Sequence, residues 1–161
     1  MERKDPKNLI GINLLASYFK GKGQSTTEVG LFEFGIDSCR FDCIIFSGAH
    51  ARIKGYEFKV SRADFLHEIK TEKWKNYLDY CHTFSFVCPK GLIDKSEVPP
   101  KVGLLWITTL NEKYGYDRDY DYPMPLWKKY PKFLGEIPED RFQRIALTLI
   151  SRVKYRKDEF F

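Results

Sequence analysis

The sequence predicts an α/β protein in which a mixed central β-sheet is flanked by helices. Two observations carry this prediction. Short apolar runs of strand length are interspersed with longer segments whose apolar residues recur at helical spacing, and the 161 residues suit one domain with one sizeable core. The chain is 43% hydrophobic and 16% aromatic, which indicates a globular protein rather than a disordered one. We therefore expect a single domain over residues 1–161.

The first half of the chain is predicted to form one helix followed by three strands. The helix has a wide apolar face and a proline near its start. The second strand is nearly continuous in apolar residues, which predicts that both of its faces are covered. A turn at residues 47–55 precedes the third strand. The predicted ranges are 6–20 for the helix and 27–34, 40–46 and 56–60 for the strands.

The second half is predicted to contain two helices and two strands. Ser61 begins the first of these helices, because Ser61 and Asp64 resemble a capping box. Tyr, Asp and Pro are concentrated at about residues 111–135, where we expect no regular structure. The predicted ranges are 61–81 and 138–157 for the helices and 83–88 and 103–109 for the strands.

Charge and composition narrow the functional classes only in part. The formal net charge of +5 is compatible with a nucleic-acid partner but does not establish one. The four cysteines form no CxxC pair, which favours buried free thiols over a zinc site or disulfides. No apolar run is long enough to span a membrane, and the amino-terminal segment is not a convincing signal peptide. We therefore expect a soluble, cytoplasmic protein with no membrane partner.

Glu57 and Lys59 form the first candidate for chemistry. Alternate residues of a strand share a face, and a buried charge is costly unless it is paired or holds a metal. Asp42 interrupts the preceding apolar strand, and antiparallel pairing could bring it beside Glu57. Mg²⁺ is typically held by one or two carboxylates with water and phosphate, and the Phe58 backbone carbonyl could add an oxygen ligand. Lys59 could orient or deprotonate a water, or stabilise transition-state charge.

Each of these residues has an alternative interpretation. Asp42 could be a surface acid on an edge strand or a partner of Arg40. Glu57 and Lys59 could form a solvent-facing ion pair, which would contribute little to stability. A buried or exposed position in the fold separates these interpretations.

The same residues carry a resemblance to a known superfamily. Asp42, fourteen intervening residues, the sequence Glu57-Phe58-Lys59 and a following helix resemble the PD-(D/E)XK nucleases. No proline precedes Asp42, unlike the pattern of the superfamily, and nothing beyond residue 110 matches. Four blocks are also similar to the MmcB-related DNA repair proteins: RFD at 40–42, EFKVSRADF at 57–65, KWKNYLDYC at 73–81 and FSFVCPKG at 84–91.

The resemblance implies a restriction-endonuclease-like core and a nuclease that hydrolyses phosphodiester bonds in DNA, in repair or other DNA processing. It implies that Asp42 and Glu57 bind Mg²⁺ or Mn²⁺ and that Lys59 assists catalysis. It also allows a homodimer or a partner in a repair complex. One alternative is a catalytically inactive nucleic-acid-binding or scaffolding protein on the same fold, because superfamily members differ in substrate and some have lost activity. Another is an unrelated α/β domain with a coincidental motif.

A second group of residues is predicted to support this site or to contact substrate. Ser61 and Asp64 are expected to cap the helix that follows the motif. Arg62 and Lys73 could contact phosphates, or they could lie on a solvated helix face. Lys73 and Tyr77 are four residues apart, so they share one face of the predicted helix.

Overall fold

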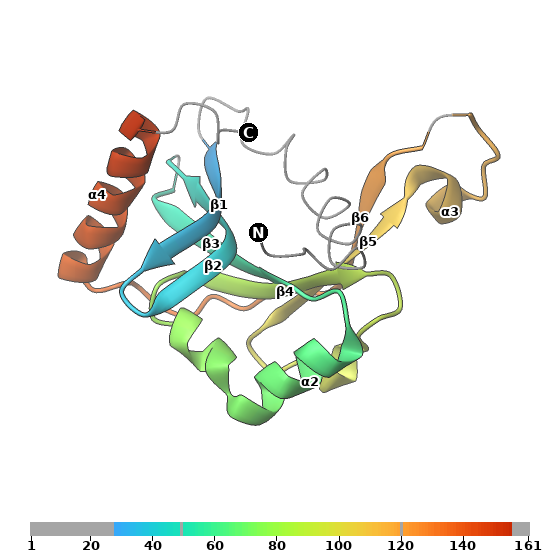
Figure 1. Cartoon of the computed structure of the whole chain (residues 1–161), viewed down its shortest axis with the longest axis horizontal. Helices are drawn as coiled ribbons and strands as arrows, with labels where there is room; N and C mark the ends of the chain where they lie inside the picture. Colours follow the sequence, from blue (N-terminus) through green and yellow to red (C-terminus); the bar gives the residue numbers. More distant parts are fainter. Residues whose placement is uncertain (1–27, 49, 120, 156–161) are drawn as a thin grey trace, which may run out of the picture.

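A six-stranded mixed β-sheet organises the part of the chain that the structure describes, namely residues 28–48, 50–119 and 121–155 of a computed structural model (Figure 1). The strands lie side by side in sequence order. The first three pair antiparallel, the third to fifth pair parallel, and the last pair is antiparallel. The strands are β1 (Glu28–Ile36), β2 (Cys39–Ser47), β3 (Arg52–Phe58), β4 (Thr83–Pro89), β5 (Gly103–Thr109) and β6 (Pro123–Lys129).

Helices lie against this sheet, which confirms the predicted α/β class (Figure 1). The parallel pair β3–β4 needs a crossover connection, and a helix with the short 3-10 helix after it supplies one. The carboxy-terminal helix lies beside the antiparallel hairpin of β1 and β2. The helices are α2 (Arg62–Thr71), η1 (Lys73–Tyr77), η2 (Lys95–Glu97), α3 (Leu110–Tyr114) and α4 (Glu139–Tyr155).

Apolar side chains pack on both faces of the sheet, because alternate residues of each strand point to opposite sides. The larger cluster lies between the sheet and the helices α2, η1 and α4, which contribute Phe65, Tyr77 and Ile145 respectively. A smaller cluster occupies the opposite face. Its buried members are Cys43, Ile45, Tyr56, Phe58, Val87, Leu105 and Ile107. Both faces of β2 are therefore covered, as its apolar sequence predicted.

The predicted helix over residues 61–81 is wrong in its second half. α2 ends at Thr71, and Glu72 adopts a left-handed backbone with φ of 55°. The chain then turns into the 3-10 helix η1. This turn allows Tyr77 to enter the core, where its ring stacks on Phe84 at 5.1 Å. Tertiary packing thus overrides the helical spacing of the sequence.

The prediction of no regular structure at about 111–135 is also wrong in part. α3 ends within this range, and β6 pairs with β5. Pro123 and Pro125 lie within β6, and a strand tolerates proline where its other edge is unpaired. Among the described strands, β6 occupies that position at the end of the sheet.

The other elements agree with the sequence more closely. The strands predicted at 83–88 and 103–109 and the helix predicted at 138–157 correspond to β4, β5 and α4. β3 begins at Arg52, earlier than predicted, and ends at Phe58. The helix predicted at 6–20 lies outside the described residues. No helix within the described ranges is long and apolar enough to cross a membrane.

Candidate active site

Asp42, Glu57 and Lys59 meet near the start of β2 and the end of β3, beside α2. The antiparallel register pairs Cys43 with Tyr56, so the next rung brings Asp42 beside Glu57. Glu57 is the penultimate residue of β3, and Lys59 directly follows the strand. The sequence pattern is therefore matched by proximity in the fold.

β1 and β2 share an irregularity at the position of Asp42. Phe41 and Ile44 both belong to the larger core cluster, so strict alternation is interrupted between them. Leu31 and Phe34 show the same interruption on β1, and Glu33 between them has a left-handed backbone with φ of 49°. The register of the two strands skips this position, because it pairs Phe32 with Cys43 and Phe34 with Phe41 but does not pair Glu33 with Asp42.

Asp42 is fixed by the backbone of the neighbouring strand. The Phe58 backbone N–H donates a 2.7 Å hydrogen bond to Asp42 Oδ2. Arg40, in contrast, pairs with Glu33 at 3.1 Å on the surface. The interpretation of Asp42 as a partner of Arg40 is therefore wrong.

Glu57 and Lys59 are both buried, with 6% and 3% of their surface exposed. Lys59 Nζ lies 3.3 Å from Glu57 Oε1, so the two side chains share one side of the backbone as predicted. The interpretation of a solvent-facing ion pair is wrong, because burial removes this pair from water. A buried pair of this kind requires further partners.

Glu68, on α2, supplies the strongest of those partners. Its Oε2 lies 2.5 Å from Lys59 Nζ, and the residue is 3% exposed. Asp64 Oδ2 lies 3.6 Å from the same ammonium, but its side chain is 56% exposed. Lys59 thus has two buried carboxylate partners and one exposed partner.

Sequence reasoning did not identify Glu68. Glu68-Ile69-Lys70 is one of three Glu-x-Lys sequences in the chain, so the motif alone does not single it out. A signal was nevertheless present. Phe65 and Ile69 define the apolar face of α2, and Glu68 lies three residues after Phe65 on that same face. An acid on the buried face of a helix requires a cation beside it.

The electrostatics of the cluster favour a protonated Glu57 in the absence of a further cation. Burial, reinforced by the charge of Asp42, raises the pKa of Glu57 to about 8. Burial also raises the pKa of Asp42, although the Phe58 N–H opposes this shift. Burial opposes the charge on Lys59, but Glu57, Glu68 and Asp64 together raise its pKa. Lys59 is therefore an ammonium at neutral pH.

Two carboxylate oxygens of this cluster are buried without a hydrogen-bond partner in the described part of the chain. They are Glu57 Oε2 and Glu68 Oε1. Leaving a buried polar atom unsatisfied costs about 1–3 kcal/mol, and more when the group is charged. The described residues contain no group of three or more His, Cys, Asp or Glu side chains arranged for a metal ion. Any metal here would be held by two carboxylates with oxygen atoms from elsewhere.

The predicted supporting residues occupy different environments. Ser61 Oγ accepts a 3.2 Å hydrogen bond from the Asp64 N–H, which confirms the predicted cap of α2. Arg62 binds both carboxylate oxygens of Glu97 at 2.7 Å, so it fastens α2 to η2. Its guanidinium is therefore ion-paired within the protein, on a side chain that is 47% exposed.

Tyr77 and Lys73 differ although they belong to one 3-10 helix. Tyr77 is 1% exposed, packs 4.9 Å from the Phe41 ring and donates a 3.2 Å hydrogen bond to the Arg40 carbonyl. It therefore supports the strand that carries Asp42. Lys73 is exposed, and among the residues that the structure describes its ammonium is in no ion pair. Its charge contributes to the potential at Asp42.

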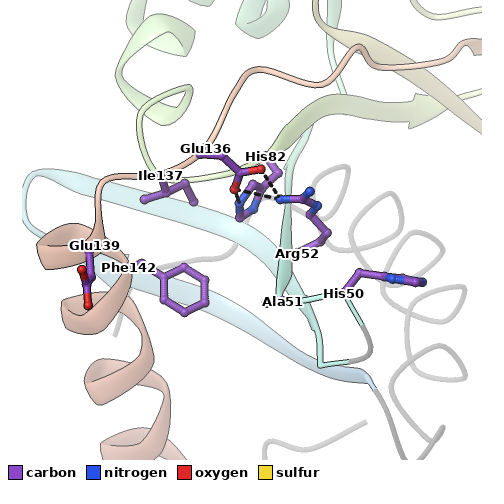
Figure 2. A pocket seen from close by; sticks show the side chains of 8 residues that line it. All are labelled: His50, Ala51, Arg52, His82, Glu136, Ile137, Glu139 and Phe142. Atoms are coloured by element: carbon purple, nitrogen blue, oxygen red, sulfur yellow. Dashed lines mark hydrogen bonds and ion pairs between the residues drawn. The ribbon is translucent and has the colours of Figure 1, made fainter.

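A second polar cluster lies at the opposite end of β3, around a cavity of about 410 Å³ (Figure 2). Arg52 Nη1 lies 2.9 Å from both carboxylate oxygens of Glu136. His82 is buried, and its Nδ1 accepts a 2.9 Å hydrogen bond from the Ile53 N–H. These contacts fasten the segment before α4 to the start of β3. The cavity is lined by His50, Ala51, Arg52, His82, Glu136, Ile137, Glu139 and Phe142.

The four cysteines agree with the prediction of buried free thiols. Cys39, Cys43, Cys81 and Cys88 are all buried and none forms a disulfide. Burial raises the pKa of Cys88 to about 12, so this thiol is un-ionised at neutral pH.

Comparison with known proteins identifies a shared fold and no family. No protein-family model matches the sequence, and no curated protein does. Among solved structures, the chain is similar to a protein of unknown function from Silicibacter pomeroyi. The two are 19% identical and superimpose with a TM-score of 0.61, over 98% of this chain and 94% of that one. The chain therefore has a fold that a second natural protein shares over nearly its whole length.

Proposed function

We propose that the protein is a Mg²⁺- or Mn²⁺-dependent nuclease that hydrolyses phosphodiester bonds in DNA, in repair or other DNA processing. The proposal includes a restriction-endonuclease-like core. The observation that supports it best is the meeting of Asp42, Glu57 and a buried Lys59 at one point of the fold. The sequence pattern alone could have been coincidental. Its convergence at the ends of two paired strands argues for a shared role.

The residues fit a divalent cation. Mg²⁺ is usually bound by one or two carboxylates, with water and substrate phosphate completing its coordination. Asp42 and Glu57 supply two carboxylates, and Glu57 Oε2 is a buried oxygen that lacks a partner among the described residues. A cation beside Glu57 would also favour its ionised form, against the burial that raises its pKa. The Phe58 backbone carbonyl is the proposed third protein ligand.

The chemistry divides between the cation and the chain. A bound Mg²⁺ would lower the pKa of a water and neutralise charge on a phosphoryl group. Asp42 and Glu57 would hold the ion, and the Phe58 N–H fixes the orientation of Asp42. Lys59, an ammonium held by Glu57 and Glu68, would donate to a phosphate oxygen as negative charge develops on it. Because its pKa is raised, we assign Lys59 the role of a donor rather than a base.

The proposed substrate is a polyanion, which agrees with the net charge of +5. Lys73 is exposed beside the site and is available to a phosphate, whereas Lys75 pairs with Glu72 at 2.7 Å. We therefore assign a phosphate contact to Lys73. Arg62, Ser61 and Asp64 instead position α2.

A catalytically inactive nucleic-acid-binding or scaffolding protein is the second candidate. Its support is the buried ion pair itself, in which Glu68 already holds the Lys59 ammonium. Such a pair could hold α2 against the sheet without any metal. Metal binding and cleavage separate the two candidates.

The test is Mn²⁺ binding by calorimetry and cleavage of single-stranded, duplex and branched DNA by the same samples. The variants are Glu57→Gln and, as a matched control, Glu28→Gln, which removes a strand glutamate paired with Lys54 at 3.1 Å. We expect binding and cleavage to be lost in Glu57→Gln and retained in Glu28→Gln. A folded wild type that binds no Mn²⁺ would overturn the nuclease proposal and favour the second candidate.

A further inference from the structure

Lys59 and a metal ion would compete for Glu57. The ammonium lies 3.3 Å from Glu57 Oε1, on the carboxylate that is proposed to bind the ion. Two cations that share one carboxylate repel each other, and the repulsion is strong where water is excluded. Binding of the ion to the free oxygen, Oε2, is therefore favoured when another group holds Lys59.

Glu68 is placed to hold it. Its Oε2 is closer to Lys59 Nζ than Glu57 Oε1 is, at 2.5 Å against 3.3 Å. It approaches from α2, whereas Glu57 approaches from β3. Asp64 is a poor substitute, because its exposed carboxylate lies 3.6 Å away and is screened by water.

The fixed position of Glu68 follows from its helix. Ser61 caps the start of α2, Phe65 anchors the helix in the core, and Arg62 ties it to Glu97. The Glu68 carboxylate is thus held against Lys59 by elements that do not include Asp42 or Glu57. Its second oxygen, Oε1, is buried without a hydrogen-bond partner in the described region.

We infer that Glu68 is a positioning residue: it retains Lys59 on the α2 side of the cluster and so leaves Glu57 able to bind a divalent cation. The inference rests on the proposed function. It adds a residue that lies outside the Asp42–Glu57–Lys59 pattern. It also distinguishes a positioning role for Glu68, which supports metal binding through Lys59, from a purely structural ion pair, which would affect folding alone.

Mn²⁺ affinity measured by calorimetry tests the inference without relying on cleavage. Glu68→Gln keeps the shape of the side chain and removes its charge, and we expect Mn²⁺ to bind about tenfold or more weakly. Glu68→Asp keeps the charge and withdraws the oxygen by one methylene, and we expect a smaller loss. The matched control is Glu72→Gln, which removes an exposed carboxylate that pairs with Lys75, and its affinity should stay within about twofold of wild type.

The competition itself is tested by Lys59→Met. Removing the ammonium should strengthen Mn²⁺ binding, and it should make the affinity insensitive to a second substitution, Glu68→Gln. Circular dichroism fixes a temperature at which each variant is folded before titration.

The outcomes separate this inference from the proposed function. A folded wild type without Mn²⁺ binding overturns both. Wild-type binding with unchanged affinity in folded Glu68→Gln overturns the role of Glu68 alone and leaves the nuclease proposal standing. Weakened binding in Glu68→Gln that persists undiminished in the Lys59→Met background also overturns it, because Glu68 would then act on the ion directly rather than through Lys59.

Discussion

The Phe58 backbone N–H donates a 2.7 Å hydrogen bond to Asp42 Oδ2, and this contact joins the two strands that carry the candidate site. The carboxylate therefore has a structural role that is separate from any chemistry. Two substitutions distinguish these roles, because an amide oxygen can accept the same hydrogen bond and a methyl group cannot.

We expect Asp42→Asn to retain the contact and Asp42→Ala to leave the Phe58 N–H without its acceptor. The free energy of unfolding of Asp42→Ala should be lower than that of Asp42→Asn by about 1–3 kcal/mol. Urea unfolding measures the difference. On the nuclease proposal, both variants lose Mn²⁺ affinity. Equal stabilities for the two variants would show that the hydrogen bond contributes nothing.

The raised pKa of Glu57 leads us to expect that the stability of the protein depends on pH. The Glu57 carboxyl has a pKa of 4.5 in an ordinary environment and about 8 in the fold, chiefly because it is buried. Between these values the folded chain binds more protons than the unfolded chain, so stability falls as the pH rises. The stability that protonated Glu57 contributes is fully present below about pH 4.5, and it is lost as the pH rises through about 8.

Urea unfolding from pH 5 to pH 9 should therefore show a decline in the wild type that is absent in Glu57→Gln. Comparing the two proteins cancels the contributions of titrating groups that do not interact with Glu57. Saturating Mn²⁺ should also flatten the wild-type curve, since a bound cation favours the carboxylate. Identical slopes for wild type and variant without metal would contradict the raised pKa.

His82 should make the stability depend on pH in the opposite sense, with a loss as the pH falls. Burial, with a further contribution from Arg52, lowers its pKa below the ordinary 6.5. Its Nδ1 accepts a hydrogen bond from the Ile53 N–H and so must be unprotonated. The unfolded chain binds the proton more tightly, so this contribution is present above pH 6.5 and is lost as the pH falls through the lowered pKa of the fold.

His82→Asn tests this dependence, because its amide oxygen can replace Nδ1 as an acceptor and does not titrate. We expect the variant to lose less stability than the wild type between pH 6.5 and pH 4.5. An NMR titration of the His82 ring should give a pKa below 6.5. A value above 6.5 would contradict the buried acceptor geometry.

The sequence predicted the strands better than the connections between them. Apolar runs identify β4 and β5 because their burial on both faces leaves little ambiguity. β6 was missed because its prolines and aromatic residues resemble a loop, and only its place at the sheet edge permits them. The break at Glu72 was missed because apolar residues three or four apart suit both an α-helix and a 3-10 helix.

The candidate site was predictable where it depends on local pattern and not where it depends on packing. Antiparallel neighbours in sequence made the proximity of Asp42 and Glu57 predictable. The burial of Lys59 depends on where α2 crosses the sheet, which local spacing does not determine. The contact of Glu68 with Lys59 depends on the same placement of α2.

Gly55 links the packing of β2 against β3 to the candidate site, because it lies against the residue that precedes Asp42. A Cβ at this position would lie 2.5 Å and 2.9 Å from two atoms of the Phe41 ring. Phe41 is fully buried and directly precedes Asp42, so it has little room to move. We expect Gly55→Ala to lower the free energy of unfolding by about 1–3 kcal/mol through overpacking.

The matched control is Gly35→Ala, a strand glycine whose Cβ would meet its nearest atom, the Cys39 carbonyl oxygen, at an ordinary 3.9 Å. Its stability should change much less. Gly55→Ala should also weaken Mn²⁺ binding if the ring is forced toward Asp42, whereas Gly35→Ala should not. A Gly55→Ala protein as stable as Gly35→Ala would show that β2 and β3 approach less closely than the structure places them.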